Sequence, residues 1–230
     1  MTDRDGPRPL RKEPMFTAPP LALLIPVILV AIYAVQAFAT PQMQDAIMGS
    51  FALSSLLLRN GDYLLLVTHI FLHGSWLHVG ANSAFCLAFA TPVVRAMGYS
   101  GQGWRGGGVL SYLAFFLICG VVAGLGYCLL NWRSAVPMVG ASGAISGLMG
   151  AAIRLRSDPF DPDIKGLLHP RVLAMTVTFC LINAGMAFAP FFVGDGMTVA
   201  WQAHIVGYLF GLLAISPWMR LLHHNYFTTS

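Results

Sequence analysis

The sequence is short of charged side chains, and carboxylates are the scarcest of them. Only 10% of its 230 residues are charged and 57% are hydrophobic, whereas a soluble domain carries about 25% charged residues. Its one glutamate is Glu13, and its aspartates lie outside the long apolar runs, with Asp195 the nearest to one. A soluble domain is therefore excluded, and so are a His-Glu-x-x-His zinc protease and a paired-aspartate intramembrane protease.

The sequence also lacks the cysteine spacing of a metal site. Cysteines inside apolar runs ordinarily pack as small hydrophobic residues, and all four lie in such runs: Cys86, Cys119, Cys128 and Cys180. We therefore expect no metal and no cofactor. The net charge of +4 could indicate a nucleic-acid partner, but the basic residues are scattered around apolar segments, so no nucleic acid is expected.

Apolar segments of spanning or nearly spanning length are what the sequence does contain. They are Leu21–Phe38, Trp76–Val94, Val109–Leu130, the short Gly-rich Val139–Ile153, Val172–Phe188 and Val199–Trp218. We predict an all-α membrane protein with six transmembrane helices, embedded in the lipid bilayer over residues 21–218 between tails at 1–20 and 219–230. The connection between the first two segments has apolar patches too short to span, and we expect helical hairpins in the membrane interface.

The basic residues indicate how these segments are oriented, because loops rich in Lys and Arg stay in the cytoplasm. Arg59 and Arg133 lie on one side. The other eleven lie on the opposite side: Arg4, Arg8, Arg11, Lys12, Arg95, Arg105, Arg154, Arg156, Lys165, Arg171 and Arg220. Both tails are therefore expected to be cytoplasmic, as an even number of spans requires. A prokaryotic plasma (inner) membrane is the default location.

The stretch VGASGAISG, residues 139–147, places serines and glycines in the short fourth segment. We expect a helix to begin near Ser142, so that unpaired backbone N–H groups lie beside the serine oxygen. That arrangement suits a nucleophile that attacks a carbonyl group. On this stretch alone, close helix packing through small residues such as Gly143 and Gly147 is the favoured alternative.

His204 shares one helical face with Gly207 and Gly211, which follow it by three and seven residues. If this face packs against the small face of the fourth segment, His204 points to Ser142, and the two form a nucleophile–base pair. A buried histidine bonded to a backbone carbonyl is the alternative. The spans contain no acid that could orient the imidazole, so packing against glycines is expected to do so.

Two further groups of polar residues lie near or inside the apolar segments. His78 and Asn82 share a face of the second segment and could both donate to an oxyanion; a hydrogen bond that stabilises the helix end is the alternative. His69 and His73, in the long connection, are expected to brace it. Asn183 stands out in the fifth segment, because polar groups are costly in a bilayer.

Together these motifs resemble those of the rhomboid family of intramembrane serine proteases. GASG matches the Gly-x-Ser-Gly of the family, HGSWLHVGAN its His-x4-His-x3-Asn, and AHIVGYLFG its Ala-His-x2-Gly-x3-Gly. The three motifs occur in the right order on the second, fourth and sixth segments. The resemblance covers the whole six-span core, about Leu21 to Trp218.

The resemblance implies the six-helix rhomboid bundle, with a short fourth helix at its centre and a water-filled cavity open to the outside. Ser142 would be the nucleophile, and His204 the general base and later the general acid. His78, Asn82 and the backbone N–H of Ser142 would form the oxyanion hole. The substrates would be single-span transmembrane proteins, cut at or near the bilayer surface.

His69 and His73 would occupy the loop-bracing positions of the family, while three other places depart from its pattern. The stretch DYLLLVTH lacks the Trp-Arg pair often found in the first connection. At the end of the second segment, Val94 and Arg95 stand where the family commonly has a glutamate and an arginine. Ser146 replaces an aromatic residue that often stacks on the histidine. The proton-transfer and oxyanion groups are all present.

Two other functions could use the same residues. A catalytically weak or inactive rhomboid-like protein would bind transmembrane helices without cutting them, and the presence of both Ser142 and His204 argues against it. A haem protein would use His78 and His204 as axial ligands, and would show Soret absorption when purified. Nothing in the sequence indicates an oligomeric state.

Overall fold

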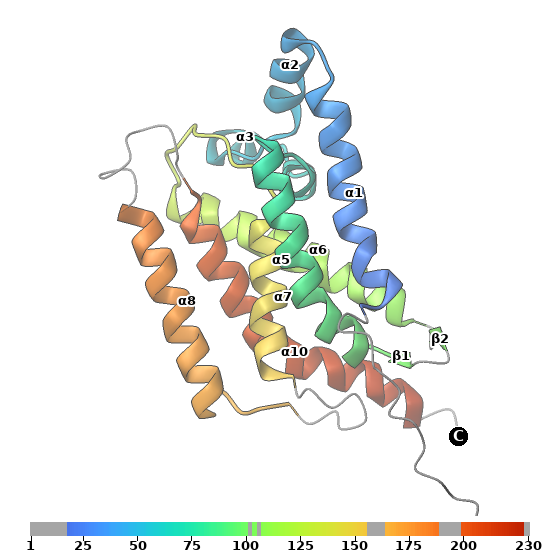
Figure 1. The fold of residues 1–230 in the computed structure, drawn as a ribbon. Helices are drawn as coiled ribbons and strands as arrows, with labels where there is room; N and C mark the ends of the chain where they lie inside the picture. Colours follow the sequence, from blue (N-terminus) through green and yellow to red (C-terminus); the bar gives the residue numbers. More distant parts are fainter. Residues whose placement is uncertain (1–17, 101–102, 105–106, 156–163, 189–198, 228–230) are drawn as a thin grey trace, which may run out of the picture.

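The structure is a computed structural model that describes residues 18–100, 103–104, 107–155, 164–188 and 199–227. In chain order its helices are α1 (Pro20–Ala37), α2 (Pro41–Phe51), α3 (Ser55–Arg59), α4 (Leu65–Thr68), the 3-10 helix η1 (His69–Phe71), α5 (Trp76–Ala96), α6 (Gly108–Leu130), α7 (Ser142–Arg154), α8 (Pro170–Phe188) and α10 (Trp201–Phe227). Strands β1 (Tyr99–Ser100) and β2 (Gly103–Trp104) pair in antiparallel fashion. The described chain is otherwise helical or irregular (Figure 1), in agreement with the predicted all-α class.

Several residues used to predict orientation and acid content lie outside the described part of the chain. The predicted N-terminal tail belongs to it only from residue 18 onward. Also outside are Arg4, Arg8, Arg11, Lys12, Glu13, Arg105, Arg156 and Asp195.

Five helices are long and apolar enough to cross a membrane: α1, α5, α6, α8 and α10. The chain is therefore a multi-pass integral membrane protein. The last of these helices continues past the predicted end at Trp218 to Phe227. The 13 residues of α7 give a length of about 20 Å at 1.5 Å per residue, which is less than the roughly 30 Å of a hydrocarbon core. A sixth crossing through this helix stays a prediction.

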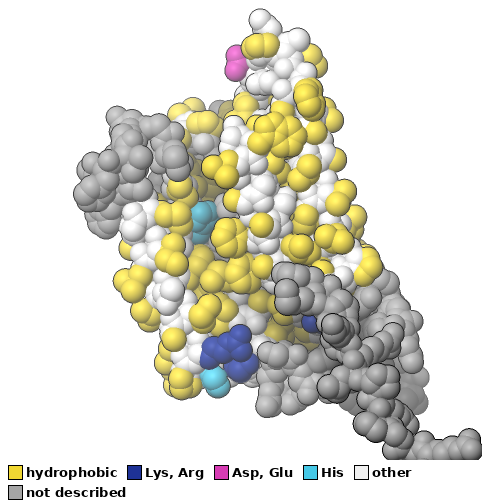
Figure 2. Space-filling model, in the orientation of Figure 1, with side chains coloured by type: hydrophobic (Ala, Val, Ile, Leu, Met, Phe, Trp, Pro, Cys, Tyr) yellow, Lys and Arg dark blue, Asp and Glu magenta, His cyan; other side chains and the backbone are white. Residues whose placement is uncertain are grey.

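The long helices carry apolar side chains on their outer faces as well as toward the interior. Val35 of α1, Leu77 of α5 and Leu181 of α8 are all exposed, and Figure 2 shows hydrophobic side chains spread from end to end over the described part of the visible face. Helices that are apolar on every side belong in a protein core or in lipid. An outer surface of this kind matches a protein surrounded by lipid chains.

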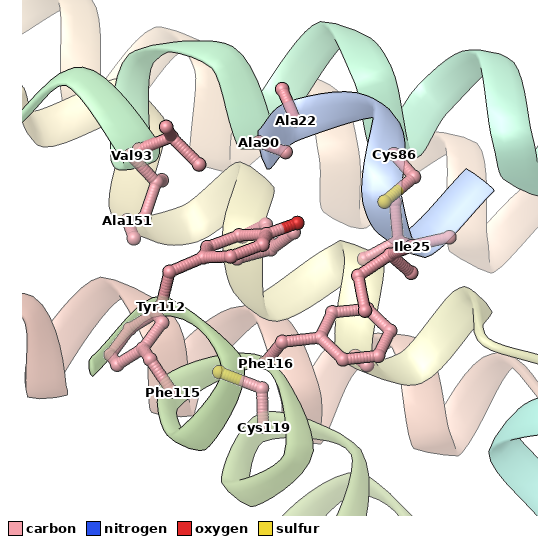
Figure 3. Packing of buried hydrophobic residues seen from close by; sticks show 14 of the residues in the cluster. Ala22, Ile25, Cys86, Ala90, Val93, Tyr112, Phe115, Phe116, Cys119 and Ala151 are labelled. Atoms are coloured by element: carbon pink, nitrogen blue, oxygen red, sulfur yellow. The ribbon is translucent and has the colours of Figure 1, made fainter. Parts of the chain in front are cut away.

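Large aromatic side chains of α6 fill the interior. Tyr112, Phe115 and Phe116 are fully buried, and they lie in one cluster with small residues of neighbouring helices, such as Ala90 of α5 and Ala151 of α7 (Figure 3). Rings packed against small side chains leave few gaps. This packing holds α5 and α7 against α6.

Glycines bring α7 and α10 together backbone to backbone. A Cβ atom on Gly207 would collide with the carbonyl oxygen of Gly143, and a Cβ atom on Gly211 with that of Gly147. The helix α7 also contacts α5, α6 and α8, and ten of its 13 residues are buried. The two small faces that the sequence suggested do meet, and their contact sets the distance between the helix starts.

The connection between α1 and α5 consists of the short helices α2, α3, α4 and η1 in series. Two backbone hydrogen bonds, 3.1 and 2.7 Å long, join Leu53 to Met138. The N–H of Gly140 donates to the carbonyl oxygen of His69 at 2.9 Å. The connection is thus helical, as predicted, and it is bonded to the loop that leads into Ser142.

Gln36 of α1 holds the far end of the same connection. Its Nε2 donates to the carbonyl oxygen of His73 at 2.8 Å, and its Oε1 accepts from the N–H of His73 at 3.3 Å. The amide is buried, where a polar group is stable only when it is paired. The start of α5 is thereby placed against the end of α1.

Candidate active site

Ser142 is the first residue of α7. Gly140, two residues earlier, has a φ of +116°, and a Cβ atom there would lie only 2.8 Å from Nε2 of His78. Glycine suits this position because it adopts a positive φ readily and has no Cβ atom to meet the His78 ring. The turn leaves Ser142 half-buried at a helix N-terminus, where the first N–H groups have no partner inside the helix. An oxygen bound there would meet free donors and the positive end of the helix dipole.

His204 lies in the first turn of α10 and contacts Ser142. Its Nε2 atom is 2.8 Å from the Oγ of Ser142, which is a short hydrogen bond. Both side chains are half-buried. The close contact of α7 with α10 at Gly207 permits this distance. An imidazole nitrogen at such a distance can take a proton from a hydroxyl group.

The other ring nitrogen of His204 is bonded to a residue whose role sequence analysis missed. Nδ1 lies 3.0 Å from Oδ1 of Asn183, a residue of α8 that is 1% exposed. The expectation that glycine packing alone would orient the imidazole is therefore corrected, because an uncharged amide also holds the ring. The signal available in the sequence was a polar side chain within an apolar segment, where an unpaired amide is costly.

His78 and Asn82, near the start of α5, lie beside the loop that precedes Ser142. A Cβ atom on Gly140 would be 2.8 Å from Nε2 of His78 and 3.8 Å from Nδ2 of Asn82. Nδ1 of His78 accepts from the N–H of Gly74 at 3.4 Å, which leaves the ring proton on Nε2. Asn82 donates one Nδ2 hydrogen to the carbonyl oxygen of His78 at 3.0 Å and has a second to offer. Two potential donors therefore lie next to the entry to α7.

His69 and His73 are buried in the connection. Nδ1 of His69 donates to the carbonyl oxygen of Leu65 at 2.7 Å, and the ring of His73 lies edge-on to that of His78, with centroids 5.0 Å apart. Burial lowers the pKa of His69 to about 4, and the hydrogen bond to Leu65 opposes this only in part. Burial, with a smaller effect of the nearby His78, also lowers the pKa of His73 to about 4. Both rings are therefore neutral at pH 7.

Known proteins resemble this chain in the same region. A family model described as "Rhomboid domain" matches residues 60–220, a range that includes Ser142, His204, His78 and Asn82. The RHOMBOID-like protein 5 of Arabidopsis thaliana is 30% identical to the chain over 102 residues. That stretch is 44% of this chain and 30% of the plant protein, so this chain matches less than a third of its relative.

Proposed function

The chain belongs to the rhomboid family, and we propose that it is an intramembrane serine endopeptidase that hydrolyses peptide bonds in or near transmembrane segments. The observation that carries the proposal is the 2.8 Å hydrogen bond between Oγ of Ser142 and Nε2 of His204. The two residues lie 62 positions apart in the chain, at the starts of two different helices. A hydroxyl group beside an imidazole base is the minimal arrangement for nucleophilic catalysis.

In the first half of the reaction, Oγ of Ser142 attacks the carbonyl carbon of the scissile bond while Nε2 of His204 takes the hydroxyl proton. The tetrahedral intermediate then collapses, the carbon–nitrogen bond breaks, and His204 returns the proton to the leaving amine. In the second half, a water molecule attacks the acyl-enzyme ester and gives a proton to Nε2. That proton passes to Oγ when the ester bond breaks.

The negative charge that develops on the carbonyl oxygen requires hydrogen-bond donors already in place. The backbone N–H of Ser142, Nε2 of His78 and Nδ2 of Asn82 would provide them. The position of both side chains next to Gly140 supports this assignment. His69 and His73 would support the site through the connection, which is bonded to the same loop.

The proposed fold in the membrane is the six-helix bundle, with α7 as the short fourth helix enclosed by the others. Basic side chains on the face shown in Figure 2 lie toward the end opposite α2, and the segment after α7 contains Lys165 and Arg171. This distribution supports cytoplasmic termini and a site that opens toward the other side. The proposed substrates are single-span transmembrane proteins. The similar protein is from a plant, and the prokaryotic plasma membrane stays a prediction.

The proposal is tested by reaction of the purified protein with a fluorophosphonate probe, which modifies an activated serine. We expect the wild-type protein to be labelled, and Ser142→Ala and His204→Ala each to abolish both labelling and cleavage of a model transmembrane substrate. The matched control is Ser146→Ala, which removes the other serine of α7. This variant should still be labelled.

Labelling that persists in Ser142→Ala would reject the assignment of the nucleophile. A wild-type protein that binds a transmembrane substrate but neither cleaves it nor reacts with the probe would be an inactive rhomboid-like protein. Thermal unfolding of each variant in detergent shows whether a loss of labelling reflects chemistry or a loss of the fold. We expect both alanine variants at the proposed pair to unfold near the wild-type temperature.

A further inference from the structure

Asn183 is a buried amide in a span, and both ends of its side chain are hydrogen-bonded. Nδ2 donates to the carbonyl oxygen of Phe179 at 2.9 Å, and Oδ1 lies 3.0 Å from Nδ1 of His204. The helix α8 that carries it runs beside α10 (Figure 1). Burying an amide in an apolar segment is costly unless its hydrogen bonds are made, and here they are made to one backbone group and to one candidate catalytic group.

Phe179, Asn183, His204 and Ser142 form a hydrogen-bonded series. The two bonds of Asn183 determine which atoms of this series carry hydrogen. A backbone carbonyl can only accept, so the group that faces Phe179 must be the NH₂ of the Asn183 amide. The amide oxygen then faces His204, and because that oxygen can only accept, Nδ1 of the ring must carry the proton. A neutral imidazole has one N–H. Nε2 therefore presents its lone pair to the hydroxyl group of Ser142, 2.8 Å away.

From this series we infer that Asn183 is a positioning residue, which holds His204 in the tautomer and ring orientation that let Nε2 act as the base for Ser142. The inference rests on the proposed protease function. When Nε2 takes the serine proton, the ring becomes an imidazolium, and its Nδ1–H continues to donate to the amide oxygen. Asn183 neither gains nor loses a proton. Its contribution is to exclude the other tautomer and other ring rotations.

The hydrogen bond from α8 restrains the imidazole at one edge, because it is made at the ring nitrogen Nδ1. The opposite ring nitrogen, Nε2, is the one that faces Ser142. A rotation of the ring that broke the first contact would therefore also move Nε2 away from the serine oxygen.

A purely structural role for Asn183 can be separated from a positioning role, because the same two helices share a second polar contact. The hydroxyl groups of Thr176 in α8 and Tyr208 in α10 lie 2.7 Å apart. Thr176 precedes Asn183 by seven residues and Tyr208 follows His204 by four, so both contacts lie along one interface. Thr176→Val removes a cross-helix hydrogen bond of similar length without touching His204. It is therefore the matched control.

The experiment compares wild type with Asn183→Leu, Asn183→Asp and Thr176→Val, all full-length and purified in the same detergent. Asn183→Leu keeps the branched shape of the side chain and removes the acceptor, whereas Asn183→Asp keeps an acceptor toward Nδ1. Cleavage of a model transmembrane substrate gives kcat and KM, and the fluorophosphonate probe gives a labelling rate that does not depend on substrate binding. Thermal unfolding is measured for each protein.

We expect Asn183→Leu to lower kcat and the labelling rate by about 10- to 100-fold, the scale known for losing a partner that orients a metal-bound histidine, with KM changed less than about twofold. Asn183→Asp should recover a substantial part of this loss. Thr176→Val should keep kcat and the labelling rate within about twofold of wild type, even if its unfolding temperature falls.

The positioning role is overturned if Asn183→Leu keeps the wild-type kcat, or if Thr176→Val loses as much activity as Asn183→Leu at an equal fall in unfolding temperature. Either result can arise only with an active wild type, so it leaves the protease proposal standing. A wild-type protein without Ser142-dependent labelling would instead remove the proposed function itself. The two failures are thus distinguishable.

Discussion

Three polar side chains from three helices form one hydrogen-bonded series at the residue scale. Ser142 of α7 is bonded to His204 of α10, and His204 to Asn183 of α8. In an apolar environment each unpaired polar group would cost free energy, so a complete series is more stable than its separate members. The same bonds leave one reactive position, the serine oxygen, where a helix N-terminus supplies further donors.

The proposed oxyanion donor Asn82 provides a test at this scale. Asn82→Ala removes one of three donors and keeps the pair of Ser142 and His204, so cleavage should slow rather than stop. We expect kcat to fall by roughly 10- to 1000-fold, the scale for one such donor. The measurement is kcat for a model transmembrane substrate. An unchanged kcat would mean that the amide serves only its bond to the carbonyl oxygen of His78.

At the scale of elements, the distance between Ser142 and His204 depends on how closely α7 approaches α10. Gly207 and Gly211 face backbone atoms of α7, so no side chain can be added there without moving one helix. Elsewhere in the fold, the connection between α1 and α5 lacks the Trp-Arg pair often seen in the rhomboid family. Gln36 and the backbone bonds between Leu53 and Met138 hold it instead.

Gly211→Ala should therefore lower both activity and stability. Its Cβ atom would meet the backbone of Gly147, and separating the helices is expected to cost about 1–3 kcal/mol, the usual range for an overpacked core. Cleavage should fall because His204 moves away from Ser142. The unfolding temperature and kcat are measured together.

The control for this prediction is Gly80→Ala, at a helical position where an added Cβ atom meets nothing within 4 Å. Alanine is favoured over glycine inside a helix by about 0.5–1 kcal/mol, so this variant should be as stable as wild type or slightly more so. If Gly211→Ala behaves like Gly80→Ala, the contact between α7 and α10 is looser than the structure indicates.

For the molecule as a whole, the polar side chains of the site are gathered at one end. The starts of α5, α7 and α10 and the end of α8 carry the site, and they lie at the same end of the molecule as the connection (Figure 1). Hydrophobic side chains are spread from end to end over the described part of the visible face (Figure 2). The site is thus held at one end of an apolar body, with buried histidines of the connection packed around it.

Because of these buried histidines, we expect the fold to be less stable in acid. The pKa values of His69 and His73 are lowered to about 4 by burial, whereas an exposed histidine in the unfolded chain has a pKa of about 6.5. Between these values the unfolded state binds more protons than the folded state. The contribution of these two histidines to the free energy of unfolding is therefore highest above pH 6.5. It falls as the pH drops from 6.5 to 4 and is lowest below pH 4.

We expect the unfolding temperature in detergent to be lower at pH 4.5 than at pH 7.5 by roughly 5–10 °C. His69→Gln, which removes one of the two groups, should make this difference smaller. A difference of the same size in that variant would show that His69 does not contribute to the acid sensitivity. The measurement is thermal unfolding in matched buffers of equal ionic strength.

The sequence by itself determined which segments become long apolar helices and where the helix carrying Ser142 begins. These are local properties, since hydropathy, segment length and a glycine-rich turn depend on neighbouring residues alone. Only the tertiary structure decided that Asn183 meets His204 and that Gln36 meets His73, because such contacts depend on how each helix is rotated and shifted against its neighbours. Those rotations follow from packing glycine against backbone and large rings against small side chains across the whole bundle, which no local pattern specifies.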